Sequence, residues 1–220
     1  MVLSLVVKCS INRVRIEPGC RGNDSLPSEN EKEEYIYFSR KDSVFSQWYP
    51  CTFVIDDKEY NCAEQYMMYT KAEIMGDGET ADTIMKLKDP SFINAFGKNV
   101  KNFEPDAWKN RRETIVRSGN MAKFFQNEEL KQKLLSTYPK TLVEARKDSE
   151  TWGIGLDKTD PRAWKKQTWQ GKNLLGKILT EVRDSLRNDI ENVNPNGNLS
   201  DINSFEMIGM NLEPDPVKTI

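Results

Sequence analysis

Histidine is absent from the 220 residues of this chain. That absence excludes catalytic systems in which an imidazole activates a serine or a cysteine. It also excludes the usual histidine-based zinc and non-haem iron sites. Acid–base chemistry in this protein must therefore use carboxylates, lysine, tyrosine, cysteine or groups of the substrate.

Cysteine is scarce, and its spacing does not suit a metal site. The chain has four cysteines, Cys9, Cys20, Cys51 and Cys62, and no two of them form a C-x-x-C pair. Cys9 and Cys20 could form a disulfide in an oxidising compartment. We favour four reduced thiols in a cytoplasmic or nuclear protein, and we expect neither a metal nor a cofactor.

Long apolar runs are also missing. No segment approaches the roughly 18 apolar residues of a transmembrane helix, so we expect no membrane association. The apolar start of the chain reaches Lys8 too early for a signal-peptide core. Charge is nearly balanced, at 32 basic and 34 acidic residues, and gives no global attraction to nucleic acid or to an anionic membrane.

The remaining composition, 37% hydrophobic and 30% charged, is that of a folded domain. Residues 17–34 are rich in Pro, Gly, Asn and Ser, which favour loops. From residue 188 onward the chain is acidic and rich in Asn and Pro. We therefore expect a flexible segment at 1–33, one domain at 34–187, and an acidic, disordered tail at 188–220.

Hydrophobic periodicity predicts a mainly helical domain. Strand-like runs at 35–38 and 52–55, with a turn at Asp56 and Asp57 before 58–60, predict a hairpin. A further strand is expected at 141–145. Helices are expected at about 61–75, 80–88, 90–96, 105–125, 127–135 and 173–186. The predicted class is α+β, a single mainly helical domain with a small antiparallel sheet.

Two ionisable side chains fall on one face of the first predicted helix. Glu64 and Lys71 are seven positions apart, which is two helical turns, so both could line one cleft. Each has a simpler interpretation. Asn61 and Glu64 fit a capping box, and Lys71 could lie on a solvated face.

Glycines beside aromatic or basic residues mark two further segments. Trp152 to Leu156 places two glycines around an indole, which suits either close backbone approach to a ligand or a tight turn beside a core tryptophan. Gly171 and Lys172 open the last helix, which suits a phosphate or an ordinary capped helix start. Residues 98–133 carry nine basic and five acidic side chains, typical of a solvated helix face or a surface that binds nucleic acid.

Five motifs in one order resemble the NADAR superfamily, the YbiA-like group. The motifs are residues 45–50 (FSQWYP), 63–68 (AEQYMM) followed by Lys71, 107–108 (AW), 152–156 (WGIGL) and 171–176 (GKNLLG). They span about residues 35–186, nearly the whole predicted domain. The resemblance implies a metal-independent hydrolase that cleaves N-glycosidic bonds.

The resemblance also implies the class of substrate. It would be a phosphorylated, ribose-containing small molecule, such as a phosphoribosyl-pyrimidine intermediate of riboflavin biosynthesis, or an ADP-ribosylated nucleic acid, notably one modified on guanine. The alternatives are a non-catalytic module that binds ADP-ribose or a related nucleotide without turnover, and a structural helical domain whose motifs serve packing.

Roles for four residues follow from the same resemblance. The essential glutamate of the family matches Glu64, its essential tryptophans match Trp108 and Trp152, and a lysine proposed to act covalently matches Lys71. The residue types suit the reaction. A carboxylate can stabilise an oxocarbenium-like transition state or activate water, an amine can hold an opened sugar as a Schiff base, and an indole can stack on a base.

Three positions depart from the family pattern. Gln65 stands where many bacterial members have histidine, and Gln47 stands where asparagine is usual. Ser149 replaces a common aspartate, so either Asp148 supplies that carboxylate through a one-residue shift or the site lacks it. The remaining substrate-binding candidates, an indole and groups suited to phosphate, are Trp48, Gly153, Gly155, Lys172, Asn173 and Arg40.

Overall fold

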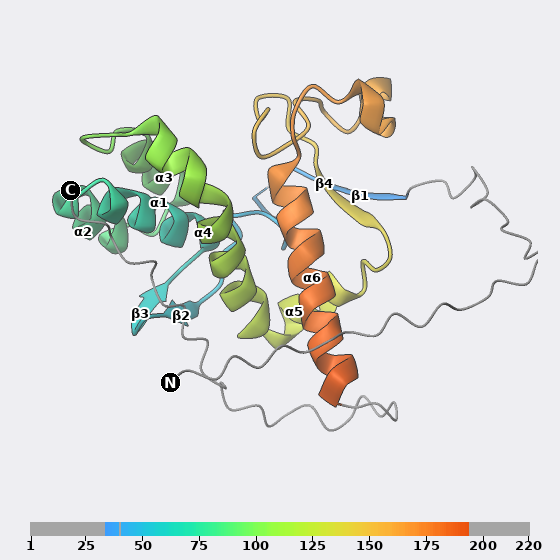
Figure 1. Ribbon diagram of the computed structural model, residues 1–220, viewed down its shortest axis with the longest axis horizontal. Coiled ribbons are helices and arrows are strands. Elements are labelled where there is room, and N and C mark those ends of the chain that lie inside the picture. The colour runs from blue at the N-terminus through green and yellow to red at the C-terminus, as the bar shows by residue number, and fades with distance from the viewer. Residues whose placement is uncertain (1–33, 40, 194–220) are drawn as a thin grey trace, which may run out of the picture. The chain divides into compact units, whose positions relative to one another are not determined.

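The computed structural model describes residues 34–39 and 41–193 (Figure 1). The predicted segment 1–33, Arg40, and residues 194–220 of the predicted tail lie outside the described residues. The elements follow in the order β1 (Tyr35–Phe38), β2 (Phe53–Ile55), β3 (Lys58–Tyr60), α1 (Ala63–Ile74), α2 (Gly78–Lys86), α3 (Pro90–Lys98), α4 (Pro105–Phe125), α5 (Glu128–Leu135), β4 (Thr141–Glu144), the 3₁₀ turns η1 (Pro161–Trp164) and η2 (Lys166–Thr168), and α6 (Leu174–Val193). The predicted α+β class is confirmed.

Local signals decide where the short helices begin. Asp89 caps α3 by accepting a 2.8 Å hydrogen bond from the Ser91 amide, and Pro90 occupies the first turn, as predicted. Helix α2 begins at Gly78, earlier than predicted, because the Asp77 carboxylate accepts from the Thr80 amide and so caps the helix. Thr80 is therefore inside α2 rather than its cap.

The strands form two separate pairs. Strands β2 and β3 make the predicted antiparallel hairpin, with Asp56 and Asp57 at φ of 50° and 58° in its turn. Strands β1 and β4 pair in parallel, and Phe38 lies opposite Glu144 in their register. The parallel pair was not predicted, because strand patterns far apart in the sequence do not indicate their partner or its direction.

Three long helices carry the core. Helix α4 packs against α1 and against α6 and lies between them, while α6 also covers β4 (Figure 1). The predicted apolar face of α6 is buried, including Leu175, Ile178, Leu179 and Val182. In the part of the chain that the structure describes, no helix combines the length and apolar character needed to cross a membrane. This packing holds the ends of β1 and β4 and the start of α1 in fixed positions.

Candidate active site

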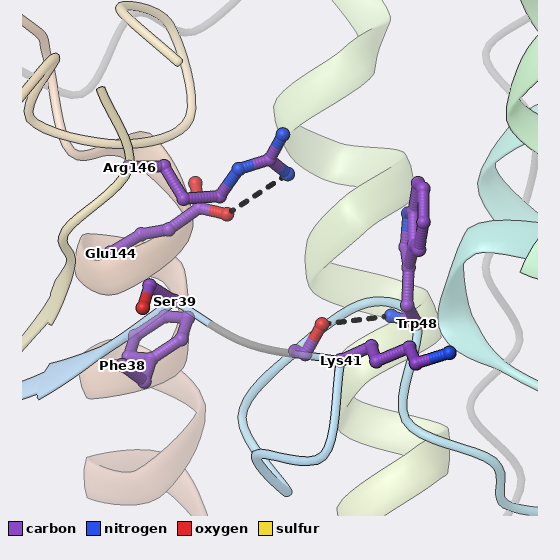
Figure 2. Close-up of a pocket in the computed structure, with 7 residues that line it drawn as sticks. Phe38, Ser39, Lys41, Trp48, Glu144 and Arg146 are labelled. Atoms are coloured by element: carbon purple, nitrogen blue, oxygen red, sulfur yellow. Dashed lines mark hydrogen bonds and ion pairs between the residues drawn. The ribbon is translucent and has the colours of Figure 1, made fainter. Parts of the chain in front are cut away.

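A cavity of about 290 Å³ opens where the two parallel strands end (Figure 2). Phe38 is the last residue of β1 and Glu144 the last of β4, so the parallel pairing brings both to the same edge. The walls are formed by Phe38, Ser39, Lys41, Ser46, Trp48, Glu144 and Arg146. Carboxyl ends of parallel strands are common ligand sites, because the chain leaves the sheet there in loops.

Glu64 is linked to this cavity through Trp48, a lining residue whose side chain donates a hydrogen bond to it. Its side chain is 3% exposed, and its Oε1 accepts a 2.7 Å hydrogen bond from Asn94. Burial raises the pKa of Glu64 to about 7, against the lowering effects of hydrogen bonds from Asn94 and Trp48 and of the Arg146 charge. A carboxyl group with a pKa near neutrality can give or take a proton at physiological pH.

The capping box predicted for Asn61 and Glu64 is wrong. The neighbouring side chain, Gln65, accepts the 2.8 Å hydrogen bond from the Asn61 amide. The Gln65 amide also donates to the carbonyls of Ile84 and Leu87 at the end of α2. Gln65 therefore has the structural role, and Glu64 is free of it.

Lys71 is buried two turns farther along α1. Its Nζ donates a 2.7 Å hydrogen bond to the Gly97 carbonyl and lies 4.3 Å from the ring centroid of Phe103 and 5.7 Å from that of Trp108. Burial lowers the pKa of Lys71, while the nearby Glu64 charge opposes that shift. The structure thus brings together three predicted site residues, Glu64, Lys71 and Trp108.

Helix α3 holds both ionisable groups, through Asn94 to Glu64 and through the Gly97 carbonyl to Lys71. Gly97 is necessary for this arrangement. A Cβ atom at this position would lie 2.1 Å from the sulfur of Met68 on α1, so only glycine lets the two helices approach this closely.

Glu144 is a second buried carboxylate, which the sequence analysis missed. It is 7% exposed and lines the cavity. Its Oε2 accepts a 3.3 Å hydrogen bond from the Ser149 hydroxyl, and its Oε1 lies 3.9 Å from Nη1 of Arg146. Burial raises its pKa, and Arg146 and Ser149 oppose the rise. The sequence held one signal that could have identified it, an acidic residue near the end of the mostly apolar predicted strand 141–145.

Asp148 lies at the outside of the site. Its side chain is 75% exposed and accepts a 3.0 Å hydrogen bond from Nη2 of Arg146, which keeps the pKa of Asp148 below its usual range. Arg146 therefore bridges a buried carboxylate, Glu144, and an exposed one.

Trp152 is half-buried, and the guanidinium of Arg112 lies 5.8 Å from its ring centroid. Arg112 is on α4, one helical turn after Trp108. Its Nε is buried and, among the described residues, has no hydrogen-bond partner. Neither Arg112 nor Phe103 was predicted from the sequence.

The two predicted glycines have their amides bonded within the turn. The Gly153 amide donates to the Ser149 hydroxyl at 3.0 Å and the Gly155 amide to the Ser149 carbonyl at 3.2 Å. A Cβ at Gly153 would lie 2.6 Å from the Glu144 carbonyl oxygen. Gly155 has a φ of +69°, which favours glycine. Tight packing against β4 explains Gly153, and the left-handed backbone conformation explains Gly155.

The start of α6 is similarly enclosed. Asn173 is fully buried, and its side chain bonds the Glu144 amide at 3.0 Å and the Leu142 carbonyl at 2.9 Å. The first amides of α6 donate to the carbonyls of Thr151 and Trp152. Lys172 is exposed beside them. Asn173 thus anchors β4, while Arg40 lies outside the described residues.

Within residues 34–39 and 41–193, no three His, Cys, Asp or Glu side chains are grouped so that they could hold a metal ion. The described cysteines, Cys51 and Cys62, are free thiols.

Comparison with known proteins identifies related chains. The NADAR domain family matches residues 35–187, which confirms the resemblance seen in the motif order. N-glycosidase R617 of Acanthamoeba polyphaga mimivirus is 38% identical over 165 residues, covering 70% of this chain and 97% of that protein. Protein irg-1 of Caenorhabditis elegans is 32% identical over 175 residues, covering 72% and 82%.

Bacterial relatives agree in sequence and in structure. N-glycosidase YbiA of Escherichia coli is 27% identical over 152 residues, covering 68% of this chain and 86% of that protein. The NMR structure of E. coli YbiA superimposes with a TM-score of 0.60 at 25% identity, covering 72% of this chain and 88% of the solved one.

Proposed function

We propose, on the premise that this chain belongs to the NADAR domain family, that it is an N-glycosidase acting on a phosphorylated ribose derivative. The names of the mimivirus and bacterial relatives support the predicted enzyme class, a glycosidase. The substrate in this proposal is a phosphoribosyl-pyrimidine or an ADP-ribosylated guanine base, and the reaction needs no metal. The bond broken joins C1 of a ribose to a nitrogen of the base.

The observation that carries the proposal is the position of Glu64. It is buried, oriented by Asn94 and Trp48, and adjacent to a cavity. Departure of the base leaves positive charge on the ribose, which an ionised Glu64 would stabilise. The same carboxylate could then accept a proton from the water that attacks C1.

Lys71 supports a second route to the same products. Burial favours its neutral, nucleophilic form. The amine would add to C1 of the opened sugar, the bond from C1 to the base would break, and the departing base would take up a proton. Water would then hydrolyse the resulting Schiff base and restore the lysine.

Aromatic and basic side chains around these groups suit the rest of the substrate. Phe103 and Trp108 flank the Lys71 ammonium, and Phe103 is 42% exposed, so its ring is accessible to a planar base. Arg146 and Lys41 line the cavity, where they could neutralise a phosphate (Figure 2). Lys172 and Arg40 remain predicted phosphate-binding residues.

The test is direct assay of the purified full chain. It is incubated separately with a phosphoribosyl-pyrimidine and with a DNA oligonucleotide carrying ADP-ribosylated guanine, and the products are separated by chromatography. Release of ribose 5-phosphate or of ADP-ribose is expected from at least one of them. Folded protein that releases neither would overturn the proposal, and saturable ADP-ribose binding without turnover would instead support the non-catalytic module.

A further inference from the structure

We propose that Glu144 is the second catalytic carboxylate of this site and that Ser149 is the residue that positions it. This inference rests on the proposed N-glycosidase function. Glycosidases commonly use two carboxyl groups, one to transfer the proton and one to stabilise the developing cation. Glu64 supplies one, and Glu144 is the other buried carboxylate at this cavity.

The position of Glu144 meets the geometric requirement. Glu144 lines the cavity together with Trp48 (Figure 2), and the Trp48 side chain donates a hydrogen bond to Glu64. The two carboxylates are close enough for their charges to affect one another. A ribose in the cavity would therefore have Glu144 beside it, and Glu64 would be linked to the cavity wall through Trp48.

The backbone of Glu144 is held on both sides. Its amide donates to Oδ1 of Asn173 at 3.0 Å, and its carbonyl accepts from the Ile154 amide at 2.9 Å. Gly153 permits this close packing, because a Cβ there would lie 3.2 Å from Oε2 of Glu144. A catalytic group needs such fixed placement, since errors of a fraction of an ångström reduce its effect.

The side chain of Glu144 is left only partly neutralised. Its charged neighbours are Arg146 and Asp148 of the following loop, Glu64 of α1, and Lys41, which lines the same cavity. The nearest cation, Arg146, is 3.9 Å away and is shared with Asp148. A buried carboxylate with incomplete pairing is costly to the fold, and a cationic transition state in the cavity would provide the missing positive charge.

Ser149 positions the Glu144 side chain through its hydroxyl group. Its hydroxyl donates to Oε2 of Glu144 and accepts from the Gly153 amide. It thus turns the chain and favours the ionised form of Glu144. An aspartate at this position would place a second negative charge beside Glu144, whereas serine leaves Glu144 as the single carboxylate at that point.

The experiment compares variants of the full chain in the glycosidase assay. Glu144→Gln is expected to lower kcat about a hundredfold or more with KM changed only a few-fold. Glu150→Gln, an exposed carboxylate of the same loop, is the matched control and should keep wild-type activity. Asp148→Asn tests the alternative that Asp148 is the second carboxylate. We expect it to lower kcat far less than Glu144→Gln does.

Ser149→Ala tests the positioning role by its pH profile. Loss of the hydroxyl should move the acidic limb of the kcat/KM profile to higher pH, because ionised Glu144 loses a donor, and Ser149→Thr should restore the wild-type profile. Circular dichroism checks folding. Glu144→Asp, which shortens the carboxylate by one methylene, replaces Glu144→Gln if that variant does not fold.

Three outcomes are distinct. Two results with an active wild type would overturn this inference and leave the proposed function standing. In the first, Glu144→Gln keeps at least a third of the wild-type kcat. In the second, Asp148→Asn lowers kcat as much as Glu144→Gln does. An unshifted pH profile for Ser149→Ala overturns the role of the serine. A folded wild type without turnover on either substrate overturns the proposed function, and this inference with it.

Discussion

Asn94 of α3 donates a 2.7 Å hydrogen bond to Oε1 of Glu64 on α1, thirty positions earlier in the chain. The bond orients one carboxylate oxygen and offsets part of the effect of burial, so the pKa of Glu64 is about 7 and not higher. Three residues later, the Gly97 carbonyl accepts a 2.7 Å hydrogen bond from Nζ of Lys71 and so orients that side chain. A single short helix therefore sets the direction of both candidate reactive groups.

Replacement of Glu64 by glutamine should remove activity and keep the fold. Glutamine can still accept from Asn94 but cannot carry charge or transfer a proton, so turnover should fall about a hundredfold or more. The helix start is secured by Gln65, so the fold should persist. Glu73→Gln, an exposed glutamate on the same helix, is the control. Equal activity in both variants would contradict the role of Glu64.

Protein stability should depend on pH through Glu64. Its pKa is about 7 in the folded protein and near 4.5 in the unfolded chain, so its contribution to the free energy of unfolding is complete below pH 4.5 and is lost as the pH rises to about 7. Relative to wild type, Glu64→Gln should therefore gain about 3 kcal/mol between these limits. Urea unfolding of both proteins at pH 5 and pH 8 measures this change. The prediction is contradicted if the difference in unfolding free energy between Glu64→Gln and wild type is the same at the two pH values.

A covalent role for Lys71 predicts a trappable intermediate. Borohydride added during turnover should reduce the Schiff base and leave a sugar adduct, which peptide mass spectrometry would place at Lys71. Lys71→Arg keeps the charge and should form none, whereas Lys109→Arg, at an exposed lysine of α4, should still form it. Turnover with no adduct on the wild type would leave the hydrolytic route through Glu64.

Trp108 should contribute to substrate binding by stacking. Trp108→Ala is expected to weaken binding by about 1–3 kcal/mol, or roughly 5- to 150-fold, and Trp108→Phe by less, because a smaller aromatic surface remains. Isothermal calorimetry with ADP-ribose provides the measurement. Trp164→Ala, at an indole that is 59% exposed, is the control. Unchanged affinity in Trp108→Ala would make Trp108 a packing residue only.

Chelation should leave the activity unchanged. The chain has no histidine, and the carboxylates near the cavity, Glu64 and Glu144, bind donors from Asn94 and Ser149. The assay is repeated after dialysis against excess EDTA. A loss of activity that added Mg²⁺ restores would contradict the metal-free mechanism.

Local sequence patterns predicted the helix positions and the pairing of Glu64 with Lys71 on one helix. Periods of apolar residues predicted α4 and α6, and Asp89 with Pro90 predicted the start of α3. The two-turn spacing of Glu64 and Lys71 predicted a shared helix face, and the structure places both against α3. Such features depend on residues a few positions apart, so the sequence carries them directly.

The cavity could not be predicted in the same way. It exists because β1 pairs with β4 in parallel, bringing Phe38 beside Glu144 across a large separation in the chain. The two strands lie more than a hundred positions apart in the chain, and α6 packs against β4, so no local pattern records the pairing. The structural role of Gln65 could not be predicted either, because the carbonyls that its side chain binds lie at the end of another helix, α2.

The amino-acid sequence by itself determined the chemistry open to this protein: no imidazole, a carboxylate and an amine on one helical face, and indoles in a family-specific order. Tertiary structure alone decided which carboxylates are buried and what surrounds them. Burial and hydrogen bonding set the pKa of Glu64 and separate Glu144 from the exposed Asp148. Those are properties of packing, and packing joins residues that the sequence keeps far apart.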